Sequence, residues 1–222
     1  MQKVVNEFSV QSSHLLLLSS SLYTLPMPKP YVPNDKWSQR AHAEGFRARS
    51  VYKLEELDTK FRLLKPGQKI IDIGAAPGSW LQYASQKIGP QGQIVGIDLK
   101  EIEAVADNVH TFICDVTNDQ ALEVALKERG FPKADLILSD IAPNTSGIKD
   151  VDQWRSIELN QMILHVASNW LKPRGRLVMK VFRGADFDEF LAEVKQQFAI
   201  VKISSVKASR DRSREVYVVC GN

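Results

Sequence analysis

The chain has only two cysteines in 222 residues, Cys114 and Cys220, and both lie in apolar, strand-like segments. Their positions do not match the ligand spacing of a zinc or iron–sulfur site, and two distant thiols cannot form a disulfide-rich scaffold. We therefore predict no metal site. Both cysteines are interpreted as small, buried hydrophobic residues of a protein from a reducing compartment.

Long hydrophobic runs are also lacking, since no apolar segment approaches the roughly 18 residues that a membrane-spanning helix needs. The short run Leu15–Leu18 is flanked by serines, and only Lys3 precedes it as a basic residue. A secretory signal peptide needs a longer apolar region and a more basic start. We expect a cytoplasmic protein without a membrane partner.

Net charge is small, at +3, which excludes a strongly basic nucleic-acid coat protein. The basic residues are nevertheless clustered in three stretches, which are Arg40 to Lys53, Lys172 to Arg183, and Lys202 to Arg214. Such clusters on a near-neutral protein favour local phosphate-binding patches. Solvated surface charge is the alternative interpretation of each cluster.

The first part of the chain differs from the rest because it is rich in Ser, Leu and Pro. Prolines at 26, 28, 30 and 33 preclude regular secondary structure there. We predict a flexible tail at residues 1–35, followed by a single domain at residues 36–222. Met27 could be the functional start of the protein, a hypothesis that a native N-terminal peptide beginning before Met27 would contradict.

The most informative segment is Ile70–Trp80, in which an isoleucine-rich strand runs into a Gly-Ala-Ala-Pro-Gly turn and a helix start. A second apolar strand, Ile94–Ile97, ends in Asp98, about 20 residues beyond the turn, where an acid can bind ribose hydroxyls. A strand, a glycine loop and a helix hold adenosine-containing cofactors at the edge of a parallel sheet. Cofactor binding is thus the first prediction, and a glycine turn that only packs a helix is the alternative.

The loop itself narrows the choice of cofactor. A dinucleotide site needs G-x-G-x-x-G so that backbone N–H groups approach a pyrophosphate. Here Gly74 and Gly78 are separated by three residues, and Pro77 has no N–H to donate. This loop suits S-adenosylmethionine, which has no phosphate and carries a charged amino-acid tail.

Apolar periodicity predicts an alternating α/β chain. Helices are expected at 46–64, 79–88, 118–129, 151–171 and 186–198. Strands are expected at 69–73, 93–98, 110–114, 134–139, 175–182, 200–206 and 215–220. No helix separates the last two strands, so they should pair antiparallel. The predicted fold is a seven-stranded, mostly parallel sheet with an antiparallel last strand and helices on both faces, the Rossmann-like fold of class I methyltransferases.

Four charged residues should converge at the carboxyl edge of this sheet. Asp140 follows one strand, Lys180 lies among apolar neighbours in another, and Glu215 begins the antiparallel strand. Lys53 falls beside the apolar stripe of the first helix and can face the same edge. A lysine in an apolar strand costs free energy unless it is paired or used. Singly, each residue could instead extend to solvent, cap a turn or pair locally.

From about Trp37 to the C-terminus, the chain resembles the FtsJ/RlmE-type (RrmJ-like) ribosomal RNA 2′-O-methyltransferases. The resemblance depends on five segments, which are Arg49–Leu54, Gly74–Trp80, Ser139–Asn144, Lys180–Phe182 and Ser213–Tyr217. Their order and spacing both agree with the family. One departure is Ser79, where many relatives have glycine, and another is the N-terminal tail.

The resemblance implies methyl transfer from S-adenosylmethionine to the 2′-hydroxyl of an A-loop uridine in large-subunit rRNA, on the assembled large ribosomal subunit. It implies the catalytic residues Lys53, Asp140, Lys180 and Glu215, with Lys180 as the general base. The expected cofactor site comprises Gly74, Gly78, Ser79, Trp80, Asp98, Asp115 and Asp140, with Asp115 beside the adenine. Expected RNA-binding residues are Arg47, Arg49, Arg183, Arg210, Arg212 and Arg214.

Other activities are less compatible with the sequence. Amino-directed methyltransferases carry Asn/Asp-Pro-Pro-aromatic where this chain has Asp140–Pro143, and cytosine-carbon methyltransferases need a loop cysteine. A dehydrogenase is disfavoured by the glycine loop. A tRNA ribose methyltransferase and a non-catalytic ribosome-assembly or RNA-binding factor stay open as alternatives, and we expect a monomer.

Overall fold

The computed structural model describes residues 35–131, 133–209 and 214–222. The tail predicted at residues 1–35, apart from Asp35, lies outside the described residues, and so do the possible start at Met27 and two predicted RNA-binding residues, Arg210 and Arg212. The four predicted catalytic residues all lie within the described ranges.

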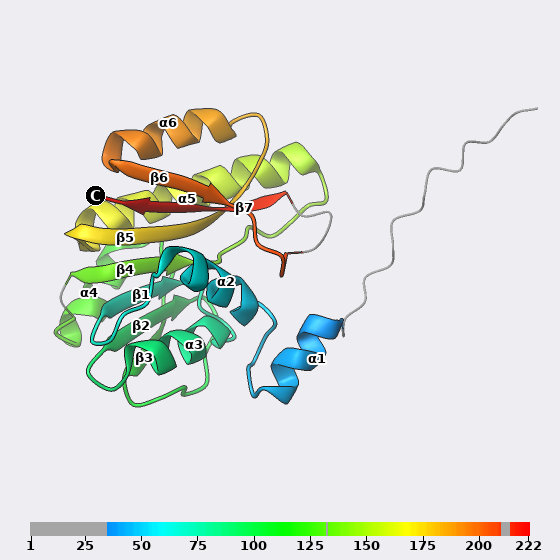
Figure 1. Ribbon diagram of the computed structural model, residues 1–222. Helices are drawn as coiled ribbons and strands as arrows, with labels where there is room; N and C mark the ends of the chain where they lie inside the picture. Colours follow the sequence, from blue (N-terminus) through cyan, green and yellow to red (C-terminus); the bar gives the residue numbers. More distant parts are fainter. Residues whose placement is uncertain (1–34, 132, 210–213) are drawn as a thin grey trace, which may run out of the picture. The chain divides into compact units, whose positions relative to one another are not determined.

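Seven strands form one sheet in the order β3-β2-β1-β4-β5-β7-β6 (Figure 1). Their bounds are β1 Lys69–Ile73, β2 Gln93–Asp98, β3 Val109–Ile113, β4 Ala134–Ser139, β5 Leu171–Phe182, β6 Ile200–Ser204 and β7 Glu215–Gly221. The first five strands run parallel, whereas β7 lies between β5 and β6 and is antiparallel to both. The predicted fold class is confirmed, including the antiparallel last strand.

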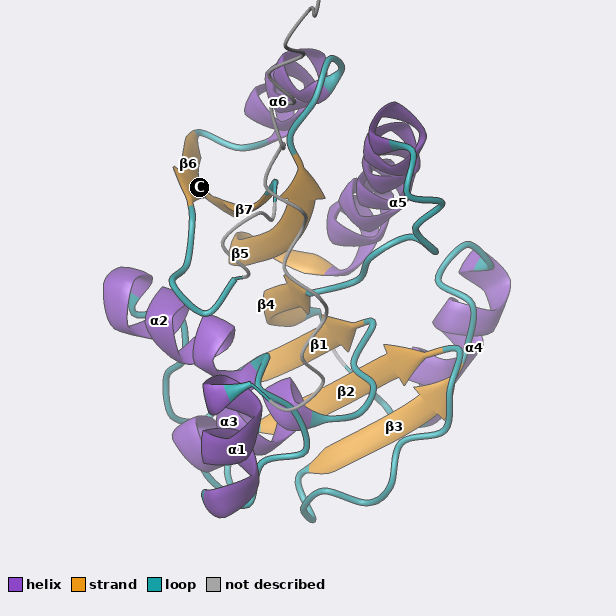
Figure 2. Cartoon of the chain, turned by 90° about the vertical axis from the view of Figure 1, so that its right-hand side faces the viewer, coloured by secondary structure: helices purple, strands orange, loops and turns teal. Residues whose placement is uncertain are grey.

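Helices cover both faces of the sheet, with α2 and α3 on one side and α4 and α5 on the other (Figure 2). The helices are α1 Lys36–Ala43, α2 Val51–Phe61, α3 Ser79–Ile88, α4 Asp119–Glu128, α5 Lys149–Trp170 and α6 Phe187–Gln197. Alternate strand residues point to opposite faces. Ile70 accordingly belongs to the hydrophobic core under α2 and α3, whereas Ile71 belongs to the core under α4, α5 and α6.

Three elements differ from the prediction. The helix predicted at 46–64 is shorter, because α2 spans only Val51–Phe61. Helix α1 was not predicted, although Asp35 caps it by accepting hydrogen bonds from the N–H groups of Trp37 and Ser38 at 3.1 and 2.9 Å. Strand β5 begins at Leu171, where the sequence predicted the end of a helix. Its first residues are accommodated by a register irregularity against β4, opposite Ala134 and Leu136.

This topology sets the position of any site. The parallel strands β1 to β5 all end at one edge of the sheet, and β7 begins at that edge because it is antiparallel. In the described ranges, none of the helices combines the length and the apolar character needed to cross a membrane.

Candidate active site

The loop between β1 and α3 has the shape that its glycines permit. Gly74 and Gly78 have φ values of +75° and +104°, which are favourable only for glycine. A Cβ atom at position 74 would lie 2.9 Å from the Cβ of Ile141, and one at position 78 would lie 2.8 Å from an Arg47 guanidinium nitrogen. The loop is held against the end of β2 because Asp98 accepts a hydrogen bond from the Ala76 N–H at 2.9 Å.

A cleft of about 410 Å³ opens beside this loop at the carboxyl ends of β1 to β4. Its lining includes four of the predicted cofactor residues, Gly74, Asp98, Asp115 and Asp140. The second oxygen of Asp98 accepts from the Lys100 N–H, and Asp115 accepts from the Thr117 N–H, both at 2.9 Å. Each carboxylate oxygen can accept a further hydrogen bond, so both acids could bind hydroxyl or amino groups in the cleft.

Two more predicted cofactor residues, Ser79 and Trp80, line a small cavity of about 50 Å³ that shares Gly74 and Asp140 with the cleft. Gly78 lines neither the cleft nor this cavity. The Ser79 hydroxyl lies 2.8 Å from the Ser50 hydroxyl, and the Trp80 indole N–H donates to the Ser50 carbonyl at 2.8 Å. In this structure, both side chains therefore join α3 to the start of α2.

Asp72, the fourth of the five residues of β1, was missed as a site residue by the sequence analysis. It lines the small cavity, and its Oδ2 is buried without a hydrogen-bond partner in the described structure. Burial raises the pKa of Asp72 well above its usual value, and the charges of Asp140 and Asp98 raise it further. A lone acid among isoleucines was the available signal, since such a residue is costly without a partner.

The structure brings the four predicted catalytic residues together. Lys53 Nζ lies 2.7 Å from Glu215 Oε1 and 3.8 Å from Asp140 Oδ1. Lys180 Nζ lies 3.0 Å from the same Asp140 oxygen. All four side chains are mostly buried, at 8 to 18% exposed. Antiparallel pairing produces this meeting, because it sets Glu215 opposite Phe182 and Tyr217 opposite Lys180.

Two neutral side chains support the cluster, and neither was predicted. The Tyr217 hydroxyl donates to Asp140 Oδ1 at 2.6 Å, and the Ser209 hydroxyl donates to Glu215 Oε1 at 2.5 Å. Burial, with the charges of Asp140 and Glu215, raises the pKa of Tyr217 well above its usual value, so this phenol stays a proton donor.

Glu215, in contrast to Tyr217, has a lowered pKa and stays ionised. Burial raises its pKa, but the ion pair with Lys53 and the hydrogen bond from Ser209 outweigh burial and lower the pKa overall, with a further contribution from Lys180. The cluster therefore combines a stable carboxylate at Glu215 with a second carboxylate, Asp140, shared by two lysines and a tyrosine.

The predicted RNA-binding arginines are used in different ways. The Arg47 guanidinium donates to the carbonyls of Pro77, Glu103 and Ala104 at 3.1, 2.9 and 2.7 Å, which ties the glycine loop to the segment after β2. Arg49 forms an ion pair with Asp35. Both side chains thus have protein partners, and their role toward RNA stays a prediction.

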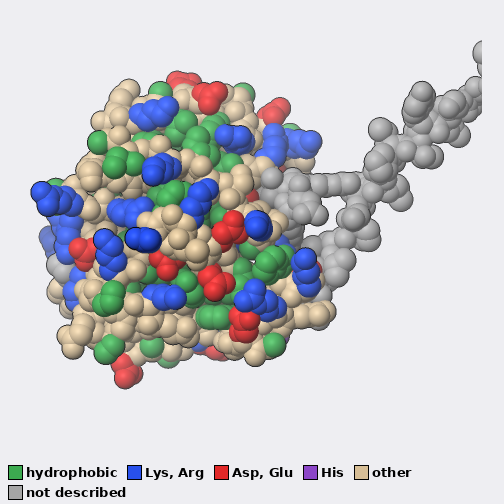
Figure 3. Space-filling model, in the orientation of Figure 1, with side chains coloured by type: hydrophobic (Ala, Val, Ile, Leu, Met, Phe, Trp, Pro, Cys, Tyr) green, Lys and Arg blue, Asp and Glu red, His purple; other side chains and the backbone are tan. Residues whose placement is uncertain are grey.

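Arg183 and Arg214 remain exposed at the edge where β5 ends and β7 begins, and the Arg183 N–H donates to the Arg214 carbonyl at 3.0 Å. On the face shown in Figure 3, Lys and Arg are interspersed with Asp, Glu and hydrophobic side chains. The exposed arginines closest in sequence to the cluster are therefore the better candidates for phosphate binding.

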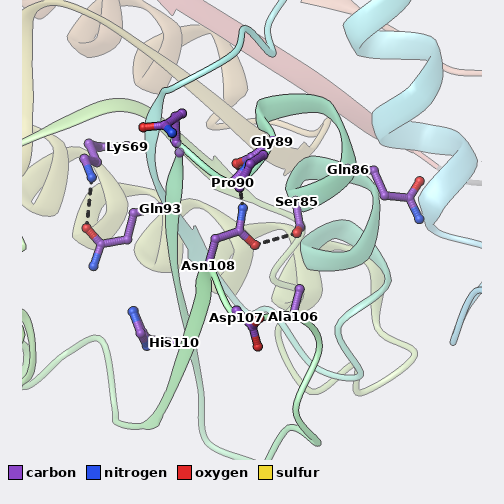
Figure 4. Close-up of a pocket in the computed structure, with 12 residues that line it drawn as sticks. Lys69, Ser85, Gln86, Gly89, Pro90, Gln93, Ala106, Asp107, Asn108 and His110 are labelled. Atoms are coloured by element: carbon purple, nitrogen blue, oxygen red, sulfur yellow. Dashed lines mark hydrogen bonds between the residues drawn. The ribbon is translucent and has the colours of Figure 1, made fainter.

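A larger pocket, of about 650 Å³, lies at the opposite edge of the sheet (Figure 4). Lys69, Gln93 and His110 line it from the starts of β1, β2 and β3, and Asn108 there hydrogen bonds to Ser85 and Gly89. None of the predicted site residues described by the structure lines this pocket. The charged cluster, rather than pocket size, therefore identifies the smaller cleft as the candidate active site.

An open, mostly parallel sheet with a glycine loop after β1 and an antiparallel β7 between β5 and β6 is the fold of class I methyltransferases. Within that class, the chain belongs to the FtsJ-like methyltransferase family, whose family model matches residues 46–222. The matched residues include all seven strands of the sheet and all four residues of the charged cluster.

Named relatives and a solved structure agree with this assignment. The chain is 43% identical over 190 residues to the ribosomal RNA large subunit methyltransferase E of Bdellovibrio bacteriovorus, covering 85% of this chain and 96% of that protein. It is 39% identical to the protein of the same name from Methanobrevibacter smithii, covering 84% and 89%. A Plasmodium falciparum crystal structure, described as a ribosomal RNA methyltransferase, is similar with a TM-score of 0.72 and 31% identity, covering 80% of this chain and 98% of that one.

Proposed function

We propose that this protein transfers a methyl group from S-adenosylmethionine to the 2′-hydroxyl of an A-loop uridine in large-subunit rRNA, on the assembled large ribosomal subunit. The observation that carries the proposal is the buried cluster of Lys53, Asp140, Lys180 and Glu215 at the border of the cleft. The names of the relatives, ribosomal RNA large subunit methyltransferase E, support the substrate class.

The residues of the cleft fit S-adenosylmethionine, which supplies the methyl group on a positively charged sulfur. Asp98 would accept hydrogen bonds from the ribose hydroxyls, and Asp115 would bind the adenine side. Asp72 fits a cationic group, because its buried Oδ2 has no partner within the described structure. The positive φ values of Gly74 and Gly78 let the backbone approach the cofactor without a Cβ atom in the way.

Lys180 would accept the proton of the attacking 2′-hydroxyl. A lysine is a base only as a neutral amine, and the neighbouring carboxylate of Asp140 favours the ammonium form. Two other groups beside Asp140 oppose that effect. Tyr217 donates a hydrogen bond at 2.6 Å to the oxygen that faces Lys180, and the Lys53 ammonium lies 3.8 Å from the same oxygen, which weakens its attraction for the Lys180 proton. After the transfer, the oxygen carries the methyl group and Lys180 carries the proton.

Lys53 and Glu215 would orient the base and the ribose. Their ion pair of 2.7 Å holds Lys53 beside Asp140, so a second ammonium lies close to Lys180. Alignment of oxygen, methyl carbon and sulfur can account for roughly 7–11 kcal/mol of the barrier. The cluster would thus act chiefly by positioning, with one proton transfer at Lys180.

The substrate is argued from the chemistry of the acceptor. A 2′-hydroxyl exists in RNA and not in DNA, and proteins bind RNA through phosphates, unstacked bases and that hydroxyl. Exposed Arg183 and Arg214 flank the end of β5 and could bind phosphates there. Binding should then weaken steeply as salt concentration rises.

The test is transfer of labelled methyl from S-adenosylmethionine to undermethylated large ribosomal subunits, with free rRNA and bulk tRNA in parallel, followed by nucleoside analysis. We expect 2′-O-methyluridine in the subunits, and its loss in Lys180→Ala with cofactor binding retained. Lys172→Ala is the matched control, because Lys172 lies at the start of the same strand and pairs with Asp135 at 2.6 Å. Label in tRNA alone would change the substrate class, and no label with cofactor bound would favour a non-catalytic assembly factor.

A further inference from the structure

Strand β5 extends beyond the end of its neighbour β4. Strand β4 ends at Ser139, opposite Met179, whereas β5 continues through Lys180–Phe182 and stays paired with β7 on its other side. We call this segment the β5 overhang. Lys180, the proposed base, therefore lies on a part of β5 that has lost one of its two neighbouring strands.

The lost neighbour leaves peptide groups that need other partners. Successive peptide groups of a strand point to alternate sides. The Arg183 N–H donates to the Arg214 carbonyl, toward β7, so the peptide groups of Lys180 and Phe182 face the side that β4 no longer occupies. Without replacement partners, these buried groups would destabilise the overhang.

Helix α5 supplies the replacement. The Asn160 side-chain amide donates to the Lys180 carbonyl at 2.9 Å, and the Ser156 hydroxyl accepts from the Phe182 N–H at 3.1 Å. The two side chains are one helical turn apart, and both are almost fully buried, at 1 and 2% exposed. Two side chains of α5 thus take the place of the missing strand.

The geometry of Asn160 admits only one orientation of its amide. Its nitrogen lies between two acceptors, the Lys180 carbonyl and the Ser156 carbonyl at 2.7 Å, so it must be the NH₂ group that faces them. Its oxygen is buried and has no partner in the described part of the chain. An unsatisfied buried oxygen costs stability, which an apolar residue at this position would avoid.

We propose that Asn160 and Ser156 are positioning residues for Lys180. They hold the backbone of the β5 overhang, so that the Lys180 amine stays at hydrogen-bond distance from Asp140. The inference rests on the proposed function, because it concerns the same base. Neither residue lines the cleft, and each acts through the backbone of the strand rather than on cofactor or RNA.

The first test compares Asn160→Leu and Ser156→Ala with the control Ile163→Val. Ile163 is fully buried on the same helix, so its shortening tests packing loss without touching the overhang. We expect Asn160→Leu to lower kcat by about 10- to 100-fold, the size of effect that misplacing a reacting group produces. Its KM for S-adenosylmethionine should stay within about twofold of the wild-type value, because the cleft contacts are unchanged.

Ser156→Ala should lower kcat less than Asn160→Leu, because Ser156 holds Phe182, which is two residues from Lys180. If Asn160→Leu fails to fold, Ser156→Ala provides the same test. Ile163→Val should lower the melting temperature and leave kcat near the wild-type value. A kcat within twofold of wild type in folded variants at both positions would overturn the proposal. Equal loss of kcat in Ile163→Val would also overturn it, since the effect would then be one of general packing.

A second measurement needs no RNA. In protein carrying ¹³C-labelled lysine, the Lys180 side-chain signal, assigned with Lys180→Arg, reports the surroundings of its amine. We expect Asn160→Leu to shift that signal, and Ile163→Val to leave it unchanged. An unchanged signal in Asn160→Leu would overturn the positioning role. A wild-type protein that methylates no RNA would instead overturn the proposed function, and the two failures are thereby distinguished.

Discussion

Tyr217→Phe is the most direct test of how Asp140 controls its lysines. The change removes one hydroxyl and keeps a ring that is fully buried, with its centre 6.1 Å from that of Trp80. The lost hydrogen bond, of 2.6 Å to a carboxylate, is of the charge-assisted kind that contributes about 1.5–3 kcal/mol. We expect the free energy of unfolding to fall by roughly that amount.

The effect on catalysis follows from the contacts that remain. Without the tyrosine hydroxyl, Asp140 Oδ1 keeps its contacts with Lys180 at 3.0 Å and Lys53 at 3.8 Å. The carboxylate that positions the proposed base is then held less firmly, and misplacing a reacting group lowers a rate by about 10- to 100-fold. The methylation rate should therefore fall by about that factor.

The assay is single-turnover methyl transfer near neutral pH. Tyr217 itself should not titrate in the assay range, because burial and two nearby carboxylates raise its pKa well above the usual value. Tyr83→Phe is the matched control, since Tyr83 is buried on α3 and its hydroxyl donates to Asp58 at 3.4 Å. An unchanged rate in Tyr217→Phe, or an equal loss of rate in Tyr83→Phe, would refute this account of the proposed base.

Three further predictions concern single acids. Asp72→Asn should stabilise the protein at neutral pH but weaken S-adenosylmethionine binding. Because the folded pKa of Asp72 is raised, this residue destabilises the wild-type protein increasingly as pH rises above about 3.9 toward that folded pKa. Urea unfolding should therefore show a higher free energy of unfolding for Asp72→Asn than for wild type at pH 7, and no such difference near pH 3. Asp98→Ala should weaken cofactor binding by calorimetry, and it also frees the Ala76 N–H; an unchanged dissociation constant would exclude a ribose role. Glu215 has a lowered folded pKa, so its stabilising effect should be full above about 4.3 and be lost as pH falls through the folded pKa. Glu215→Gln should therefore reduce the difference in stability between pH 7 and pH 3, and an unchanged difference would contradict this.

The order of helices and strands was predictable because glycine turns and apolar periodicity are local features of the sequence. Gly74 and Gly78 mark the loop after β1, and the absence of a helical pattern between the last two strands required them to be antiparallel. The predicted antiparallel strand also placed Glu215 at the edge of the sheet where the strand that carries Lys180 ends. The register of β5 and β7 agrees with this placement. Helix α1 was missed because its eight residues are mostly polar and directly follow a proline-rich stretch.

The supporting residues of the site could not be predicted in the same way. Tyr217 has the appearance of an ordinary strand aromatic, and Asn160 that of a polar residue on a long helix. Their roles depend on where other chain segments end, which no local pattern reports. Arg47 shows the same limit, because its hydrogen bonds to three backbone carbonyls could not be predicted from the sequence, and its role toward RNA stays a prediction.

The cluster can be understood as a balance between two opposite requirements on Lys180. Burial of two ammonium groups requires two carboxylates nearby, and Glu215 and Asp140 provide them. A base, however, must release its proton readily, which a dedicated carboxylate partner would prevent. In the structure, Glu215 forms an ion pair with Lys53, whereas Asp140 is shared among Lys53, Lys180 and Tyr217. If Lys180 is the base that we propose, it is thus paired well enough to be buried, yet it shares its carboxylate oxygen with two other groups. The rate of Tyr217→Phe tests whether this sharing matters.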